Sequence, residues 1–227
     1  MSARGVEIVA DGIAVRGPAG IVVQDVALDA RPGSVSVLVG PGGSGRTALL
    51  LALGARFRTS RGTIAVDGTR LPRGAAHARR RITVARAAPV VDLEERLTVG
   101  ELAAERRAIG GPHVSDESLA DAFDLMDLPF TPHTLAGDLS RVEQLLLLLA
   151  LAAAEQPGGV LVDDVDSGIA GTDLDRAWHA VRALAHSGPT VVATATAPPP
   201  SGAAAADLVV ALPGHQTHLR ARGGGRR

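Results

Sequence analysis

One run of eight residues has the types and spacing that bind phosphate groups. In order, its members are Gly40, Pro41, Gly42, Gly43, Ser44, Gly45, Arg46 and Thr47. Small residues let successive backbone N–H groups converge on the β- and γ-phosphates of a nucleotide, and the N-terminus of a following helix adds its dipole. Thr47 is then in place to ligate Mg²⁺. Arg46 stands where the pattern requires lysine, and the competing interpretation is a plain loop between a strand and a helix.

A pair of acidic residues ends an apolar segment far downstream. Residues 160–162 are all apolar, and Asp163 and Asp164 follow directly. A carboxylate at the end of a strand suits the shell of a magnesium ion, so Asp163 is the predicted metal partner of Thr47. Asp164 lies where a water-activating carboxylate belongs and is the candidate catalytic residue. A calcium-binding EF-hand fails here because Ile169 stands where that loop needs glycine.

Alternating strands and helices must bring these two groups together. Residues 35–39 predict a short buried strand and residues 47–53 a helix, which gives the order strand, glycine-rich loop, helix. Apolar and β-branched runs predict further strands at 82–85, 160–162, 190–194 and 208–212. Helical spacing occupies 140–155, 173–185 and 98–126, the last of these punctuated by Gly110, Gly111 and Pro112. Strands buried on both faces that alternate with helices predict a partly parallel α/β sheet.

The N-terminal third has a different pattern. Short β-branched runs at 13–15 and 21–23, broken by glycine and proline, predict a hairpin-like β region. A strand at 62–66 ends in the tight turn Asp67-Gly68. The basic run 79–81 is interpreted as a solvated stretch leading into the strand at 82–85.

Composition excludes several classes of function. All 23 basic residues are arginine, so no lysine is present to form a Schiff base. The formal net charge is −1, which gives no global basic field for nucleic acid. Aromatic residues make up 2% of the chain, too few for a platform that stacks bases. With no cysteine, zinc or iron–sulfur sites that need thiolates are excluded as well. We expect no nucleic-acid partner.

Hydropathy predicts a globular domain. Hydrophobic residues make up 46% of the 227-residue chain, enough for a substantial core. No segment reaches the roughly 18 apolar residues of a membrane span, and the start lacks the pattern of a signal peptide. A soluble, unexported protein is therefore expected.

Several motifs resemble, in order and spacing, the ATP-binding cassette of ABC transporters. They are Arg31-Pro32-Gly33, the loop at 40–47, Ser60 to Gly68, Leu97-Thr98-Val99, Leu139-Ser140 and Val160 to Gly168. The resemblance implies a P-loop NTPase of the ABC-cassette type, with a RecA-like α/β core, an antiparallel β subdomain and a helical subdomain at about 97–137. We assign residues 1–213 to this domain and predict that the arginine- and glycine-rich residues 214–227 are a disordered tail.

Seven motif positions depart from the family's pattern. In the phosphate-binding loop Arg46 replaces the family's lysine, and Gly17 lies near the place of the adenine-stacking aromatic. Ala87 replaces the glutamine that senses the γ-phosphate, Asp164 replaces the general-base glutamate, Ala170 replaces the dimer-facing aspartate, and Thr196 replaces the switch histidine. The signature loop keeps Ser140 but has lost both of its glycines. A planar guanidinium does not lie under phosphates as a compact ammonium does. The carboxylate of Asp164 is one methylene short, so hydrolysis is expected to be slow.

The resemblance implies an ATP-binding subunit that couples ATP binding to a separate integral membrane transporter subunit. Each ATP, with Mg²⁺ held by Thr47 and Asp163, lies between the 40–47 loop of one cassette and the signature loop with Ser140 of another, in a homodimer or a heterodimer. Hydrolysis is expected to be weak or dependent on the partner. The implied location is cytoplasmic, at the inner face of the cell membrane.

Three other functions compete with this interpretation. The motif losses favour a cassette-like structural or regulatory subunit that is not catalytic and binds little nucleotide. A GTPase is excluded because its guanine-specifying motif needs lysine. A small-molecule kinase predicts neither the motif at 60–68 nor Leu139-Ser140.

Overall fold

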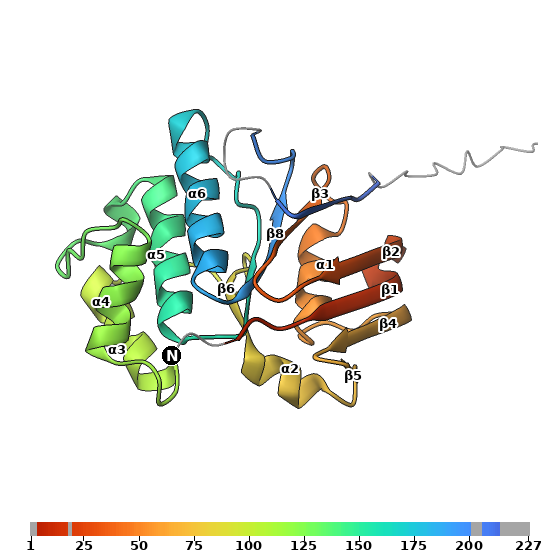
Figure 1. Ribbon diagram of the computed structural model, residues 1–227. Helices are drawn as coiled ribbons and strands as arrows, with labels where there is room; N and C mark the ends of the chain where they lie inside the picture. The colour runs from red at the N-terminus through yellow and green to blue at the C-terminus, as the bar shows by residue number, and fades with distance from the viewer. Residues whose placement is uncertain (1–3, 18–19, 201–205, 214–227) are drawn as a thin grey trace, which may run out of the picture.

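The computed structural model describes residues 4–17, 20–200 and 206–213, which form two sheets with helices between and beside them (Figure 1). The first sheet has the strand order β2-β1-β4-β5, and its neighbouring strands are antiparallel. Its strands are β1 (Ile8–Gly17), β2 (Gly20–Ala30), β4 (Arg61–Val66) and β5 (Thr69–Arg70). The hairpin-like β region and the turn at Asp67-Gly68 are both confirmed.

The second sheet is parallel and has the order β6-β7-β8-β3-β9. Its strands are β3 (Val35–Val39), β6 (Ile82–Arg86), β7 (Gly159–Val162), β8 (Thr190–Ala195) and β9 (Leu208–Ala211). The predicted α/β fold with a parallel sheet and a separate antiparallel sheet is therefore confirmed. Because β8 lies between β3 and β7, the carboxyl ends of these strands share one edge of the sheet.

Both faces of the parallel sheet are buried, which explains the uninterrupted apolar runs. In β7, Val160 and Val162 face the hydrophobic core on the helical side, whereas Leu161 faces the core shared with the antiparallel sheet. The same alternation places Val191 and Val192 of β8 in different cores. Successive side chains of a strand point to opposite faces, so a strand between two cores is apolar at every position.

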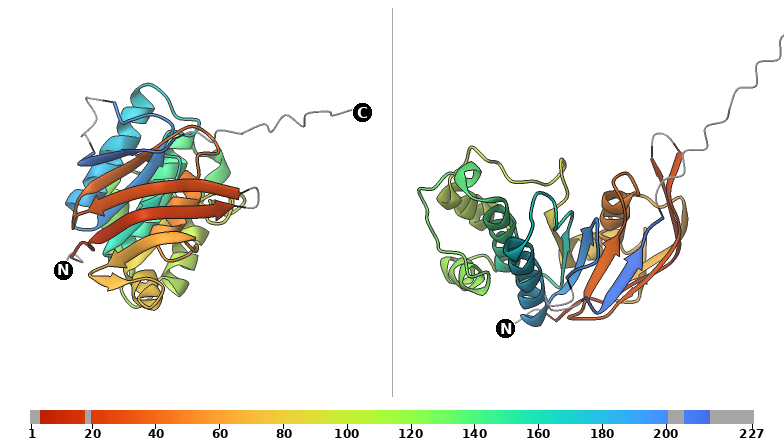
Figure 2. Two further views of the ribbon diagram at one scale, coloured as in Figure 1. Left: turned by 90° about the vertical axis from the view of Figure 1, so that its right-hand side faces the viewer. Right: turned by 90° about the horizontal axis from the view of Figure 1, so that it is seen from above.

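The helices divide between the two cores. Helix α1 (Arg46–Leu53) lies between the two sheets, and α5 (Arg141–Ala154) and α6 (Thr172–His186) cover the other face of the parallel sheet (Figures 1 and 2). Helices α3 (Val99–Ile109) and α4 (Asp116–Leu125) flank α5, and the short η1 (Ala136–Asp138) precedes it. Among the described residues, no helix is both long and apolar enough to cross a membrane.

Two details refine the sequence expectations. The helical segment 98–126 is two helices, and the chain breaks between them at residues 110–115, where Gly110, Gly111 and Pro112 punctuate the pattern. The basic run 79–81 does lead into β6, but as the last turn of helix α2 (Ala75–Arg81). Arg79 and Arg81 there donate to the carbonyl oxygens of Ala55 and Arg4, so the run is partly structural. The predicted tail at 214–227 lies outside the described residues.

Candidate functional site

The glycine-rich loop joins β3 to α1, which begins at Arg46, one residue before its predicted start. Gly43 and Gly45 have φ angles of 78° and 86°, in the left-handed region that favours glycine. A Cβ atom on Gly45 would also lie 2.5 Å from Cγ2 of Val23 in β2. The loop therefore needs glycine at position 45 for its conformation and for its close approach to the antiparallel sheet.

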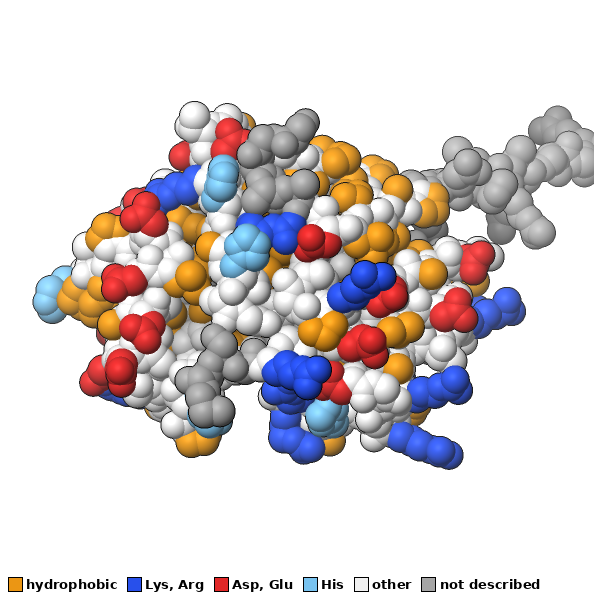
Figure 3. Space-filling view, viewed as in Figure 1, with side chains coloured by type: hydrophobic (Ala, Val, Ile, Leu, Met, Phe, Trp, Pro, Cys, Tyr) orange, Lys and Arg blue, Asp and Glu red, His pale blue; other side chains and the backbone are white. Residues whose placement is uncertain are grey.

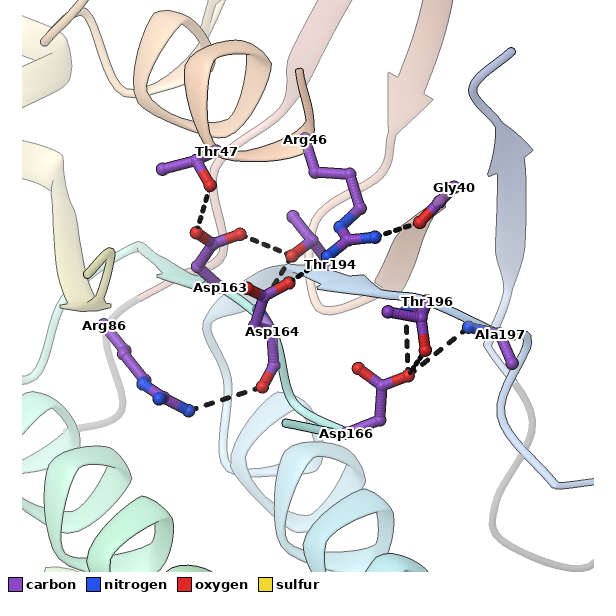
Figure 4. A network of polar contacts seen from close by, with 10 residues as sticks. All are labelled: Gly40, Arg46, Thr47, Arg86, Asp163, Asp164, Asp166, Thr194, Thr196 and Ala197. Atoms are coloured by element: carbon purple, nitrogen blue, oxygen red, sulfur yellow. Dashed lines mark hydrogen bonds and ion pairs between the residues drawn. The ribbon is translucent and has the colours of Figure 1, made fainter. Parts of the chain in front are cut away.

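The structure brings Thr47 and Asp163 together at the shared edge of the parallel sheet (Figure 4). Thr47 Oγ1 donates to Asp163 Oδ2 at 2.5 Å, and Thr194 Oγ1 of β8 donates to Asp163 Oδ1 at 2.5 Å. Asp163 is only 2% exposed. Burial raises the pKa of its carboxyl, although the two threonine hydrogen bonds act in the opposite direction.

Arg46 joins the loop to the second aspartate. Its guanidinium donates from Nη1 to the carbonyl oxygen of Gly40 and from Nη2 to the carboxylate of Asp164 (Figure 4). The residue is 8% exposed, so this ion pair is largely shielded on the arginine side. The carboxylate of the candidate catalytic residue is thus bound by the residue that replaces the lysine.

Three elements hold the backbone around Asp164. Its N–H donates to Thr194 Oγ1 at 2.8 Å, and Arg86 Nη1 from the end of β6 donates to its carbonyl oxygen at 3.3 Å. Asp164 has a φ of 50°, a left-handed conformation that aspartate tolerates better than most residues. Its carboxylate position is consequently determined by β6, β7 and β8 as well as by Arg46.

Sequence reasoning missed three members of this network. Thr194 and Arg86 bind the two aspartates, and Asp166 accepts hydrogen bonds from the N–H groups of Thr196 and Ala197 (Figure 4). A fully buried threonine within the apolar strand β8 is a signal that could have revealed Thr194. Thr196, at the place of the expected histidine, serves here to position the chain through Asp166.

Ser140 lies at the N-terminus of α5 and caps it. Its hydroxyl donates to Glu143 Oε2 at 2.6 Å and accepts from the Glu143 N–H at 3.4 Å, while its own N–H donates to Glu143 Oε2 at 2.9 Å. Such a capping box satisfies helix donors that otherwise lack partners. Among the described residues, no hydrogen bond links Ser140 to the network around Asp163.

We expect the substitution Glu143→Gln to lower stability at neutral pH but not in acid. The hydrogen bonds from the side chain and backbone of Ser140 lower the pKa of Glu143. Its charge therefore stabilises the fold above the unfolded pKa of about 4.3, and this contribution disappears as pH falls through the lowered value. Glutamine keeps the cap without the charge, so urea unfolding should show a loss of about 0.5 kcal/mol at pH 7 that vanishes in acid.

The variant Ser140→Ala is the matched control for this measurement. It removes the capping hydroxyl and should cost about 1 kcal/mol of unfolding free energy at neutral pH. If Glu143→Gln lost the same stability at both ends of the pH range, the charge of Glu143 would not be what stabilises the cap.

The donor set around the loop suits a magnesium-bound phosphate. Magnesium takes oxygen ligands, and Thr47 Oγ1 and an Asp163 oxygen lie side by side. The Ser44 hydroxyl, 1% exposed, is buried with no hydrogen-bond partner among the described residues. An unpaired buried hydroxyl at a glycine-rich loop is satisfied when a phosphate oxygen binds there.

Comparison with known proteins identifies the family of this chain. The family model described as ABC transporter matches residues 23–167. The chain is 28% identical over 183 residues to the Nod factor export ATP-binding protein I of Burkholderia thailandensis, a match that covers 77% of this chain and 57% of that protein. It is 31% identical over 196 residues to an uncharacterized ABC transporter ATP-binding protein of Mycobacterium bovis, covering 84% of this chain and 58% of that protein.

The chain thus spans under three-fifths of the length of these two relatives. Among solved structures, a dimeric bacterial ABC transporter cassette matches with a TM-score of 0.71 and 16% identity, covering 91% of this chain and 94% of that one. This likeness shows the fold, and the family model covers more than half of the chain. The protein belongs to the ABC transporter family, with the fold of its ATP-binding cassettes.

Proposed function

We propose that this chain is the ATP-binding subunit of an ABC transporter and acts through a separate integral membrane subunit. The observation that carries the proposal is the contact between Thr47, which follows the glycine-rich loop, and Asp163, which follows β7. These residues are 116 positions apart in the chain, yet they form one oxygen-rich pair at the edge of the parallel sheet. Both relatives named above are ATP-binding proteins by name.

We assign the ATP site to the loop and its acidic partner. Backbone amides of residues 42–47 and the Ser44 hydroxyl would bind the phosphates, and Thr47 and Asp163 would hold Mg²⁺. The magnesium ion, when bound, neutralises charge on the phosphate oxygens. The chain contributes the rigid positions of these groups, since Asp163 is fixed by threonines from both α1 and β8.

The proposed activity is ATP binding with weak hydrolysis in the isolated chain. A general base must be free to accept a proton from water. The Asp164 carboxylate is instead engaged by the guanidinium of Arg46. While that contact holds, the carboxylate oxygen that binds Arg46 is not free to bind a water molecule. Binding therefore matters more than turnover in this proposal.

A second cassette completes the site in this proposal. The Ser140 end of α5 would face the ATP held by another cassette, in either a homodimer or a heterodimer. The membrane subunit would then place the protein at the cytoplasmic, inner face of the cell membrane. A conventional cassette as partner would supply the catalytic groups that this chain lacks.

Calorimetric titration with ATP tests the assignment directly. With Mg²⁺ present we expect micromolar binding, and with the metal removed by EDTA we expect at least about tenfold weaker binding, because the Thr47–Asp163 pair then has no cation to hold. Absence of heat up to millimolar Mg·ATP would overturn the proposal. It would leave the alternative of a structural or regulatory cassette that binds little nucleotide.

A further inference from the structure

A cavity of about 1300 Å³ is lined by none of the phosphate-loop residues 40–47. It opens between the C-terminal end of α1, strands β1 and β4, and the segment that leads into α2. Its volume exceeds the roughly 300–1,000 Å³ of most small-molecule sites, so it has room for a sizeable ligand.

The charged side chains that line this cavity are all arginines. Arg16, Arg56, Arg58 and Arg79 contribute to the wall, and among the described residues no aspartate or glutamate does. None of the four forms an ion pair with a carboxylate in the described part of the chain. The cavity therefore concentrates positive charge, which Glu155 outside the wall offsets only in part, at Arg56.

Two of these arginines are held in place by the backbone. Arg56 donates to the carbonyl oxygens of Gly54 and Ile82, each at 2.9 Å, and Arg79 Nε donates to the Ala55 carbonyl at 2.9 Å. Burial and the nearby charge of Arg79 lower the pKa of Arg56. Two fixed like charges in one wall repel each other, and a bound anion would relieve that repulsion.

The cavity lies within a wider basic region. Residues 56–81 contain eight arginines and a single carboxylate, Asp67. In Figure 3, blue side chains gather over α2, β4 and β5, at the lower right of the view. The whole chain has a formal net charge of −1, so this concentration is local rather than a property of the composition. An anion is attracted to this end of the molecule in particular.

Most of the remaining wall is apolar, apart from Thr59 and Ser60. Phe57 is 42% exposed and presents its ring to the cavity wall. Ile64, Leu71 and Ala75 line the cavity beside it. A purely inorganic anion would leave this surface uncovered, whereas a ligand with an apolar group would bury it.

We propose that this cavity binds an organic phosphate that carries an apolar group. The arginines receive the phosphate through charge-assisted hydrogen bonds, for which the guanidinium fork is suited. Phe57 and the apolar residues beside it cover the hydrocarbon part. None of the loop residues 40–47 lines the cavity, but Gly17, near the place of the adenine-stacking aromatic, does. The cavity therefore borders the proposed ATP site, and competition with Mg·ATP is part of the test.

Octyl phosphate is the probe for the soluble form of such a ligand. We expect saturable binding by calorimetry that persists in excess Mg·ATP, because none of the phosphate-loop residues 40–47 lines the cavity. Arg58→Glu should weaken it at least about tenfold through the reversed charge. Arg58 is exposed and has no hydrogen bond or ion pair among the described residues, so the substitution should not disturb folding.

Arg61→Glu is the matched control, with the same charge change three residues away. Ser60 and Gly62 line the cavity, whereas Arg61 between them does not. Because successive side chains of a strand alternate, Arg61 points to the opposite face of β4. Its substitution should leave octyl phosphate binding within about twofold, since it changes only the distant field. Ala75→Phe, which fills the apolar side, should weaken binding of octyl phosphate.

Vesicles distinguish a lipid headgroup from a free phosphate ester. Cosedimentation with phosphatidylcholine vesicles that contain phosphatidic acid, lost in Arg58→Glu but not in Arg61→Glu, assigns the ligand to the membrane. Octyl phosphate binding without cosedimentation assigns it to a soluble ester. No binding of either probe, equal effects of the two arginine variants, or displacement of octyl phosphate by Mg·ATP would overturn the proposal.

Discussion

The variant Asp163→Asn is expected to lose the magnesium dependence of ATP binding. In the presence of Mg²⁺ its Kd should rise about 10- to 100-fold, because a neutral amide is a far weaker magnesium ligand than a carboxylate, and losing even an outer-shell partner costs 10–100-fold. With EDTA in place of Mg²⁺, the variant should bind ATP at least as tightly as the wild type, because a negative charge beside the loop is gone. Calorimetry with and without the metal measures all four values.

The same variant should gain stability relative to the wild type as pH rises through the acidic range. Burial raises the pKa of Asp163, so the folded protein binds its proton more tightly than the unfolded chain does. Wild-type stability therefore falls as pH rises from the unfolded pKa of about 3.9 through the raised value. Asparagine does not titrate, and its Tm relative to wild type should increase across that window in metal-free buffer.

Two results would contradict this account of Asp163. A variant that still binds Mg·ATP more tightly than metal-free ATP would show that the metal is held elsewhere. A variant whose Tm relative to wild type falls with rising pH would show that the ionised carboxylate is favoured in the folded protein, contrary to its burial.

The strands were predictable because their residues satisfy a local requirement. β3 has the bounds expected from the sequence, since five consecutive buried residues followed by glycine leave little ambiguity. β7 begins one residue earlier than expected because Gly159 still pairs with Ile82 and Thr190. Helix ends were less predictable: Gly110, Gly111 and Pro112 marked an interruption of the helical pattern, but they did not show that Ser115 starts the second helix with its own capping box.

The network around the two aspartates was only half predictable. Parallel strands end at the same edge, so topology alone suggested that Thr47 and Asp163 would meet. No motif near Arg46 or Asp164 indicated that the two side chains would form an ion pair, because they are 118 residues apart and only tertiary packing brings them together. The arginine-lined cavity could not be predicted from the sequence either, because its basic residues come from three separate segments: β1, the segment after α1, and α2.

The variant Asp164→Asn is expected to tighten Mg·ATP binding about tenfold, the opposite of the effect on its neighbour. The substitution removes a negative charge beside the phosphate loop and releases the guanidinium of Arg46. A freed guanidinium can form charge-assisted hydrogen bonds with phosphate oxygens. A tenfold change corresponds to about 1.4 kcal/mol, within the range of such bonds.

The matched variant Arg46→Gln should weaken Mg·ATP binding about 10- to 100-fold, because it removes the only cation in the loop. If the two residues act through their ion pair, adding Asp164→Asn to Arg46→Gln should tighten Mg·ATP binding only about threefold. In that background the substitution relieves only the repulsion between the Asp164 carboxylate and the phosphates. Calorimetry of the four proteins gives this coupling. Equal gains in both backgrounds would show that Arg46 does not respond to Asp164.

Turnover separates this account from a catalytic role for Asp164. A carboxylate held by Arg46 contributes little as a base, so Asp164→Asn should change the ATP hydrolysis rate of the isolated chain by less than about threefold, against the 10²–10⁴-fold that a working general base supplies. A loss of tenfold or more would show that the carboxylate leaves Arg46 when ATP is bound. The arginine would then position a functional base instead of restraining it.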